Sequence, residues 1–150
     1  MPEAVRDTYS SGVTPIADDV GMSEGDHEPK NATVRAGATM QAAGNPPKSI
    51  CEYAGRLSTG DEDFSVALMR SPAGWTEPTQ APEFREITAV IEGHVLVHLP
   101  DRSIEVRAGE SIDVAPGVPV RYETPEPAVY VAVCVPAFSA ALVHREEATP

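Results

Sequence analysis

The sequence predicts an all-β domain, and three observations support this fold class. From residue 48 onward the chain consists of short runs rich in β-branched and aromatic residues. Glycine and proline interrupt these runs roughly every eight to twelve residues. Helical periodicity is almost absent. Together these features are typical of antiparallel strands arranged as a sandwich or a closed barrel.

The spacing of the turns predicts eight strands. They cover residues 50–56, 63–71, 86–92, 94–99, 103–107, 111–114, 120–124 and 129–135. The run 94–99 alternates clearly, with Val95 and Val97 on one face and His94 and His98 on the other. We expect the valines to be buried and the histidines to face solvent, about 13 Å apart along the strand and too far apart to share a metal ion.

The first 47 residues differ in composition from the rest of the chain. Their single aromatic residue is Tyr9, and they contain five prolines and acidic runs such as DDVGMSEGDHEP. Such a segment buries too little apolar surface to offset the entropy that is lost on ordering. We therefore expect residues 1–47 to form a flexible acidic arm and residues 48–150 to form the β-barrel.

Charge and cysteine content argue against several functions for this chain of 150 residues. With 23 acidic and 11 basic residues the net charge is -12, which disfavours nucleic acid and anionic membranes as partners. No apolar stretch is long enough to cross a membrane and no secretory signal is visible, so we expect a cytoplasmic protein. Cys51 and Cys134 lie far apart without metal-ligand spacing, and we expect buried, reduced thiols.

Two motifs are framed by glycines at turns between strands. The first, GWTEPTQAPEFREITAVIEG, runs from Gly74 to Gly93 and contains Glu86; the second, GESIDVAPGVPVRYET, contains Gly109 and Gly117. In order and spacing these residues resemble the two motifs of the cupin superfamily. The resemblance implies a double-stranded β-helix, the jelly-roll barrel of the cupins, with a ligand pocket in its mouth. Within the superfamily the chain looks most similar to small bacterial cupins of the ethanolamine-utilisation protein Q group.

The metal positions of the cupin motifs are replaced in this chain. In metal-binding cupins, two histidines and a glutamate of the first motif and one histidine of the second motif hold the ion. The resemblance places Gln80, Pro82 and Val120 at the histidine positions and keeps Glu86. One carboxylate and one amide are too few donors for a transition metal, so we expect neither a metal nor another cofactor.

Cupin motif positions point into the barrel, and strand alternation extends this inward-facing set. We expect Glu86 and Tyr122 to be catalytic, the carboxylate as general base and the phenol as donor to a developing oxyanion. The expected substrate-binding residues are Gln80, Thr88, Val120, Thr124, Trp75 and Met69. Trp75 either packs beneath the loop before the third strand or forms a lid over an apolar ligand. Three charged residues near this loop are expected at the solvated rim: Glu77, Glu83 and Arg85.

These residues predict a metal-independent cupin that binds a small, partly apolar organic molecule, such as a secondary metabolite, and acts as an isomerase, cyclase or lyase. Two alternatives stay open. In the first, the barrel is a non-catalytic ligand-binding or accessory module, and Glu86 only braces it. In the second, an atypical set such as Glu86 with Glu83, or with His27 from the arm of a neighbouring subunit, holds a metal. The resemblance also implies a homodimer.

Overall fold

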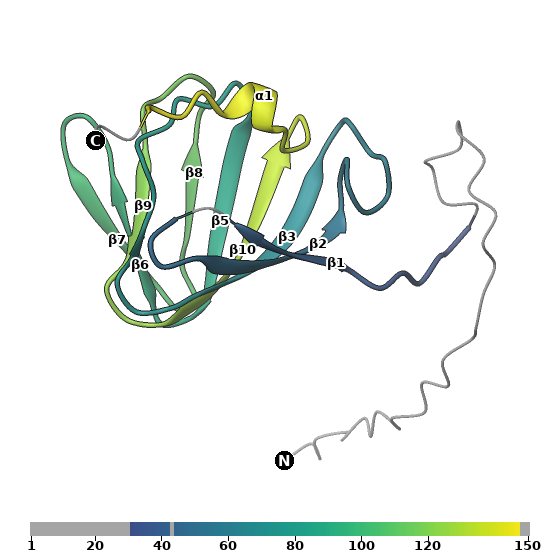
Figure 1. Cartoon of the computed structure of the whole chain (residues 1–150), viewed down its shortest axis with the longest axis horizontal. Helices are drawn as coiled ribbons and strands as arrows, with labels where there is room; N and C mark the ends of the chain where they lie inside the picture. The colour runs from purple at the N-terminus through teal and green to yellow at the C-terminus, as the bar shows by residue number, and fades with distance from the viewer. Residues whose placement is uncertain (1–30, 43, 148–150) are drawn as a thin grey trace, which may run out of the picture.

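The computed structural model describes residues 31–42 and 44–147, which form ten strands and one short helix (Figure 1). In chain order the elements are β1 (Ala38–Ala42), β2 (Lys48–Ala54), β3 (Ser65–Ser71), β4 (Trp75–Thr76), β5 (Arg85–Glu92), β6 (His94–His98), β7 (Ser103–Arg107), β8 (Ser111–Val114), β9 (Arg121–Thr124), β10 (Ala128–Val135) and α1 (Ala140–Val143). Each of the eight predicted strands overlaps an observed one. The predicted all-β class is confirmed.

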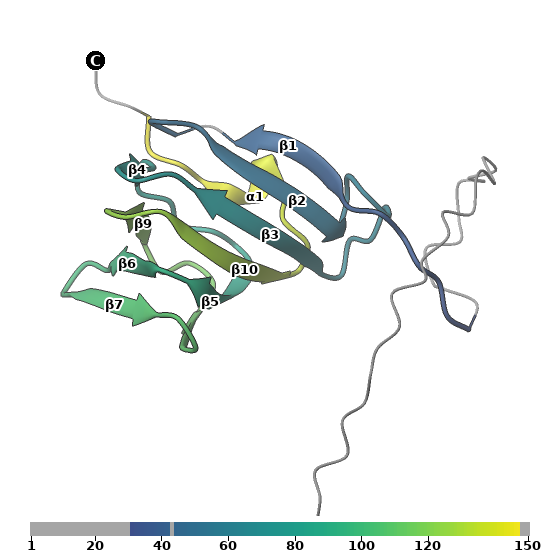
Figure 2. The same cartoon turned by 90° about the horizontal axis from the view of Figure 1, so that it is seen from below.

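The strands form two sheets, which Figure 2 shows from below. One sheet has the order β1-β2-β3-β10-β5-β8 and the other the order β4-β9-β6-β7. Neighbouring strands of the described residues pair antiparallel throughout. The chain crosses between the sheets several times, so that strands distant in sequence, such as β3 and β10, become neighbours. This arrangement encloses an interior lined by both sheets.

Strand β1 corrects the predicted domain boundary. It pairs with β2 along its whole length, from Ala38 opposite Glu52 to Ala42 opposite Lys48, and so belongs to the six-stranded sheet. The boundary at residue 48 was wrong because the sequence ATMQA contains no aromatic residue and only one β-branched residue. Its five residues are also too few to show a clear alternation of polar and apolar side chains. Residues 1–30 and 43 of the predicted arm, His27 among them, lie outside the described residues.

The glycines of the two motifs occupy turns that need a left-handed backbone. Gly74, Gly93, Gly109 and Gly117 have φ angles of 77°, 73°, 87° and 80°. At Gly93 a Cβ atom would also overlap the backbone carbonyl oxygen of Pro127. A side chain there would be strained both by the backbone conformation and by this contact. The sharp turn between β5 and β6 thus depends on glycine.

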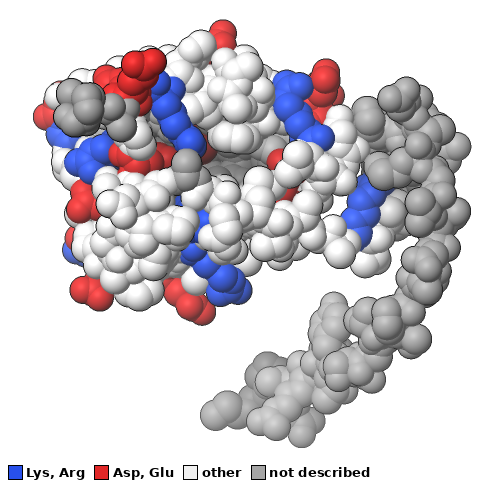
Figure 3. Space-filling model, viewed as in Figure 1, with Lys and Arg blue, Asp and Glu red and all other residues white. Residues whose placement is uncertain are grey.

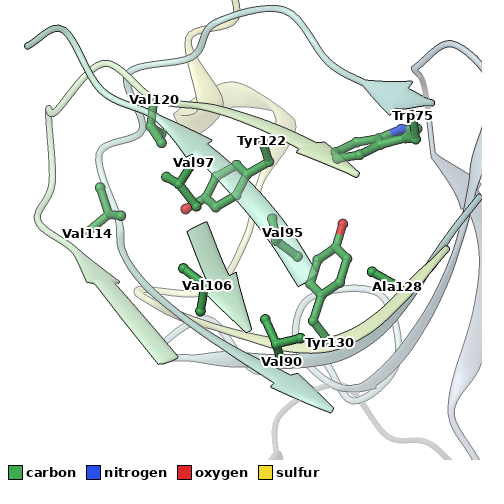
Figure 4. Close-up of a cluster of buried hydrophobic side chains, with 10 residues drawn as sticks. All are labelled: Trp75, Val90, Val95, Val97, Val106, Val114, Val120, Tyr122, Ala128 and Tyr130. Atoms are coloured by element: carbon green, nitrogen blue, oxygen red, sulfur yellow. The ribbon is translucent and has the colours of Figure 1, made fainter. Parts of the chain in front are cut away.

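A hydrophobic core fills the part of the interior that the four-stranded sheet covers (Figure 4). Val95 and Val97 are fully buried, as the alternation of β6 predicts, and His94 and His98 are half-exposed on the other face. His98 bonds to the Glu123 carboxylate across the strands at 2.8 Å. Trp75 is also fully buried and packs within this core, so it is not a lid.

Among the described residues, no helix is long and apolar enough to cross a membrane.

Candidate functional site

A cavity of about 180 Å³ lies beside the core, in the other part of the interior. Its floor is the inner face of β1, β2, β3, β10 and β5, and its opposite wall comes from β9 and the segment 77–80. Phe138 and Arg145 from the C-terminal segment complete the enclosure. The lining combines aliphatic and aromatic surface with a few carboxyl, hydroxyl and amino groups. This composition is typical of a small-molecule site.

The predicted site residues divide between the cavity and the core. Four of them line the cavity: Glu86, Tyr122, Gln80 and Met69. The other four are buried outside its lining: Thr88, Val120, Thr124 and Trp75. The hydroxyl of Thr124, for example, donates to the Pro72 carbonyl at 2.9 Å. The motif positions and the strand alternation that extends them point to the interior, but they do not distinguish its packed core from its cavity.

Glu86 is held by a thiol. It lies opposite Cys134 on the neighbouring strand, and the Cys134 Sγ donates to Glu86 Oε2 at 3.3 Å. Burial raises the pKa of the Cys134 thiol, and the negative charge of Glu86 raises it further. The thiol therefore stays protonated at neutral pH and acts as a donor to the carboxylate. As expected from the sequence, Cys134 is buried and reduced; Cys51 is also free but only partly buried.

Tyr122 brings a phenolic proton to the same end of the cavity. Its hydroxyl oxygen is buried and makes no well-aligned hydrogen bond with a described residue, although Glu86 and Thr88 lie near enough to act on its pKa. Burial raises the pKa of Tyr122 well above its ordinary value, and the charge of Glu86 adds to this effect. In Figure 4 the hydroxyl points toward Val97 and Val114, and Val114 pairs with Glu86 across β5 and β8. Tyr122 thus offers a neutral O–H donor beside Glu86 that is not committed to a well-aligned hydrogen bond with a described residue.

Glu77 is a second buried carboxyl group, and its predicted position at the solvated rim was wrong. It is 6% exposed, whereas the side chains of Glu83 and Arg85 are 59% and 53% exposed and do lie at the rim. Burial raises the pKa of Glu77, although the charges of Lys48 and Arg145 lower it in part. Alternation could have predicted this burial. Glu77 lies two residues after the buried Trp75 in an extended segment, so the two side chains point to the same side.

The C-terminal segment closes the mouth of the cavity over Gln80. Backbone bonds run from Gln80 N to Val120 O at 2.9 Å and from Val120 N to Gln80 O at 2.8 Å, which fix Gln80 beside β9. On its other side the Arg145 guanidinium donates to Gln80 Oε1 at 3.3 Å and lies 3.8 Å from Glu77 Oε2. Further backbone bonds join the same two segments, including Glu146 N to Thr79 O at 2.8 Å. The amide of Gln80 therefore orients an arginine at the entrance.

Lys48 is a buried cation that the sequence analysis did not select. It is 8% exposed and lines the cavity from the start of β2. Its Nζ donates to the Tyr130 hydroxyl at 3.3 Å and lies 4.0 Å from the centroid of the Trp75 ring. Tyr130 Oη is also 2.9 Å from Ser71 Oγ. The sequence analysis missed Lys48 because it lies at the predicted boundary of the arm, two residues before the first expected strand. Without an expected strand, no inward direction was assigned to its side chain.

The residues at the cupin metal positions do not fit a transition metal. Gln80 and Val120 contribute an amide and an alkyl group, and Glu86 is engaged by Cys134. Within residues 31–42 and 44–147, no group of three or more histidine, cysteine, aspartate or glutamate side chains lies close enough together to hold an ion. Transition metals need three or four imidazole, thiolate or carboxylate ligands. The described donor set therefore does not match that requirement.

Comparison with solved structures identifies the fold. The chain superposes on an RmlC-like cupin from Shewanella frigidimarina with a TM-score of 0.60 and 14% identity, covering 77% of this chain and 97% of the other. The polyketide cyclase RemF of Streptomyces resistomycificus gives a TM-score of 0.58 and 19% identity, over 77% and 78% of the two chains. The Clostridium difficile EutQ protein gives 0.50 and 19%, over 62% and 66%. The chain therefore has the fold of the cupin superfamily, as its two glycine-framed motifs predict.

Sequence comparison adds one relative. The chain is 37% identical over 105 residues to the protein named Endoribonuclease YbeY of Myxococcus xanthus. The match covers 69% of this chain but 36% of that protein, so the chain spans about a third of the length of its curated relative. No family model matches the chain.

Proposed function

We propose that this protein is a cupin enzyme that binds a small, partly apolar organic molecule in its barrel and catalyses proton transfer without a metal ion, as an isomerase, cyclase or lyase. One observation carries the proposal. The buried Tyr122 hydroxyl makes no well-aligned hydrogen bond with a described residue, and it lies beside the Glu86 carboxylate at one end of the cavity. A base and a neutral donor are the two groups that proton abstraction next to a carbonyl requires.

Each group has a defined role in this proposal. Glu86 removes a proton from carbon, and the thiol of Cys134 orients one of its carboxylate oxygens by hydrogen bonding. Tyr122 donates to the oxygen on which negative charge develops, and its raised pKa keeps the phenol protonated for this purpose. Glu77, whose pKa is raised by burial, is suited to return a proton to the product. The likeness to a polyketide cyclase is consistent with a cyclic or aromatic substrate but does not define one.

The proposed chemistry can be tested with phenylacetone, a small apolar ketone, by following exchange of its α-hydrogens in heavy water with proton NMR. The wild-type protein should accelerate exchange, and Glu86→Gln should lower the protein-dependent rate about a hundredfold or more. Tyr122→Phe should lower it by about the same factor or more, because the oxyanion loses its donor. Arg102→Gln, on an exposed turn far from the cavity, is the matched control and should behave as wild type. Exchange that continues at the wild-type rate in Glu86→Gln would refute the assignment.

The likeness to EutQ keeps a second candidate, a non-catalytic ligand-binding or accessory cupin. In that case phenylacetone would bind saturably without any acceleration of exchange, and Glu86→Gln would leave its affinity unchanged.

Endoribonuclease activity is not part of the proposal. A net charge of -12 opposes binding of a phosphate backbone, and Figure 3 shows acidic and basic side chains interspersed over the visible face rather than gathered in a basic patch.

The proposed enzyme would act as a homodimer. The outer face of the six-stranded sheet carries an apolar row in which Cys51 lies opposite Leu68, Leu68 opposite Val131 and Val131 opposite Ala89. These side chains are only partly buried in the single chain. A second copy would cover them, and light scattering that shows a monomer at micromolar concentration would count against this assembly.

A further inference from the structure

The charge of Lys48 is not neutralised by contact with any described acid. Its ammonium group is enclosed by the faces of Trp75 and Tyr130, with ring centroids at 4.0 and 5.6 Å, and by the Tyr130 hydroxyl at 3.3 Å. Among the described residues no carboxylate lies within ion-pair distance of Lys48 Nζ. Aromatic faces and one neutral oxygen compensate only part of the cost of burying a cation. The ammonium group therefore has hydrogen-bonding capacity left toward the cavity.

The acids that share the cavity have other partners. Glu52 lies on the same strand as Lys48 but accepts hydrogen bonds from the backbone N–H groups of Leu57 and Ser58 at 3.1 and 2.7 Å. Glu77 lies 3.8 Å from the Arg145 guanidinium at the entrance. Glu86 accepts from Cys134 at 3.3 Å. Each carboxylate thus has a separate hydrogen-bond or ion-pair partner, and although the Lys48 charge acts on Glu77, no described acid forms an ion pair with Lys48. A position beside its ammonium group is left for an external anion.

The floor of the cavity separates these charges along the strands. Ile50 lies opposite Met69, and Met69 lies opposite Tyr130, so an apolar row adjoins Lys48. Cys134, which marks the position of Glu86, lies four residues beyond Tyr130 on β10, about 13 Å away along the backbone. From one end to the other, the floor presents a cation with a hydroxyl group, then apolar side chains, then a carboxylate.

We infer that the substrate of the proposed reaction is a small organic anion, whose carboxylate or enolate oxygen binds Lys48 and Tyr130 while its apolar body lies over Ile50 and Met69. This inference rests on the proposed function, because it names the substrate class of the same cavity. The ammonium group supplies a charge-assisted hydrogen bond, and Tyr130, fixed by Ser71, supplies a second donor. Anchored in this way, the molecule places its far end toward Glu86.

The experiment compares benzoate with benzamide, which have nearly the same shape but differ in charge, by ligand-observed NMR titration at neutral pH. Wild-type protein should bind benzoate about tenfold more tightly than benzamide, as expected for one charge-assisted hydrogen bond. Lys48→Met should weaken benzoate binding to the level of benzamide and leave benzamide binding unchanged. Lys48→Arg, which keeps the charge, should retain the preference for benzoate. Tyr130→Phe should give a smaller loss.

The stability of Lys48→Met separates a binding role from a structural one. Replacement of a buried charge by an apolar side chain of similar length is often neutral or stabilising, so the melting temperature should be unchanged or higher. A lower melting temperature together with an unchanged preference for benzoate would mean that Lys48 only supports the fold, and would overturn the inference. Equal binding of benzoate and benzamide by the wild-type protein, or no binding of benzoate, would overturn it as well.

These outcomes are independent of those that test the catalytic proposal. Glu86→Gln removes the proposed base but not the anion site, so it should retain the preference for benzoate. If phenylacetone exchange does not depend on Glu86 while Lys48→Met abolishes the preference for benzoate, the protein is an anion-binding module and not the proposed enzyme. If exchange depends on Glu86 and the preference is absent, the enzyme acts on neutral molecules and the inference about Lys48 fails.

Discussion

The packed core and the cavity lie side by side on the inner face of the same sheet, yet they differ in what covers them. Regular strands of the four-stranded sheet cover the core with valines such as Val95 and Val97, which are fully buried. The cavity is covered by the irregular segment 77–80, Phe138 and Arg145. Irregular segments cannot interdigitate with a sheet as evenly as strands can. The difference shows how one alternating pattern provides both a scaffold and a binding site.

The largest expected effect concerns packing in the two regions. Trp75→Ala removes the largest fully buried side chain of the core and should lower the free energy of unfolding by about 3–5 kcal/mol. Met69→Ala, in the cavity wall, should cost less than half as much, because its side chain already borders empty space. Urea unfolding of the two variants measures both losses. Equal losses would mean that the cavity region is as tightly packed as the core.

The second effect tests how well the cavity is enclosed. Cys134 borders the cavity and has a raised pKa because of burial and the charge of Glu86. In a Cys51→Ala variant, the reaction of Cys134 with a disulfide reagent at pH 8 should be about a hundredfold slower in the folded protein than in the same protein unfolded in urea, since it requires local opening. Similar rates would show that the entrance formed by Arg145 and Phe138 opens freely.

The smallest effect concerns the energetic cost of polar groups in the cavity. Burial raises the pKa of Glu77, so the folded state keeps this proton to a higher pH than the unfolded state does. Stability is therefore lost as pH rises from the usual glutamate pKa through the raised value. Glu77→Gln avoids this loss and should melt about 2–4 °C higher than wild type near neutral pH. The difference should vanish in acid, as thermal melts at several pH values can show.

Glu52→Gln is the matched control for this comparison. Its carboxylate is also buried, but two backbone N–H groups bind it, and so the substitution should lower stability by about 1 kcal/mol. Stabilisation by Glu52→Gln, or destabilisation by Glu77→Gln at neutral pH, would contradict the distinction between a carboxylate held by backbone N–H groups and one whose pKa is raised by burial.

The strands and the inward-facing positions could be predicted from the sequence, because both depend on local alternation and on turn residues such as Gly93. Thr88, Thr124 and Glu86 were all correctly placed in the interior. Whether an inward position meets a packed layer or a hollow depends on the residues opposite it, which are distant in sequence. For the same reason the sequence did not reveal the inward direction of Glu77 or the position of Lys48 between two aromatic rings. Those contacts depend on tertiary structure.

The hydrogen bond between Cys134 and Glu86 also gives the protein an intrinsic spectroscopic reporter. The stretching vibration of an S–H group absorbs in a part of the infrared spectrum where water and other protein groups contribute little, and it shifts when the thiol donates to a charged acceptor. Because the thiol remains protonated, its vibration, distinguished from that of the second free thiol by a Cys51→Ala variant, reports on the carboxylate without labelling. Infrared difference spectra recorded while a molecule enters the cavity would then follow the ionisation of Glu86 during binding and turnover.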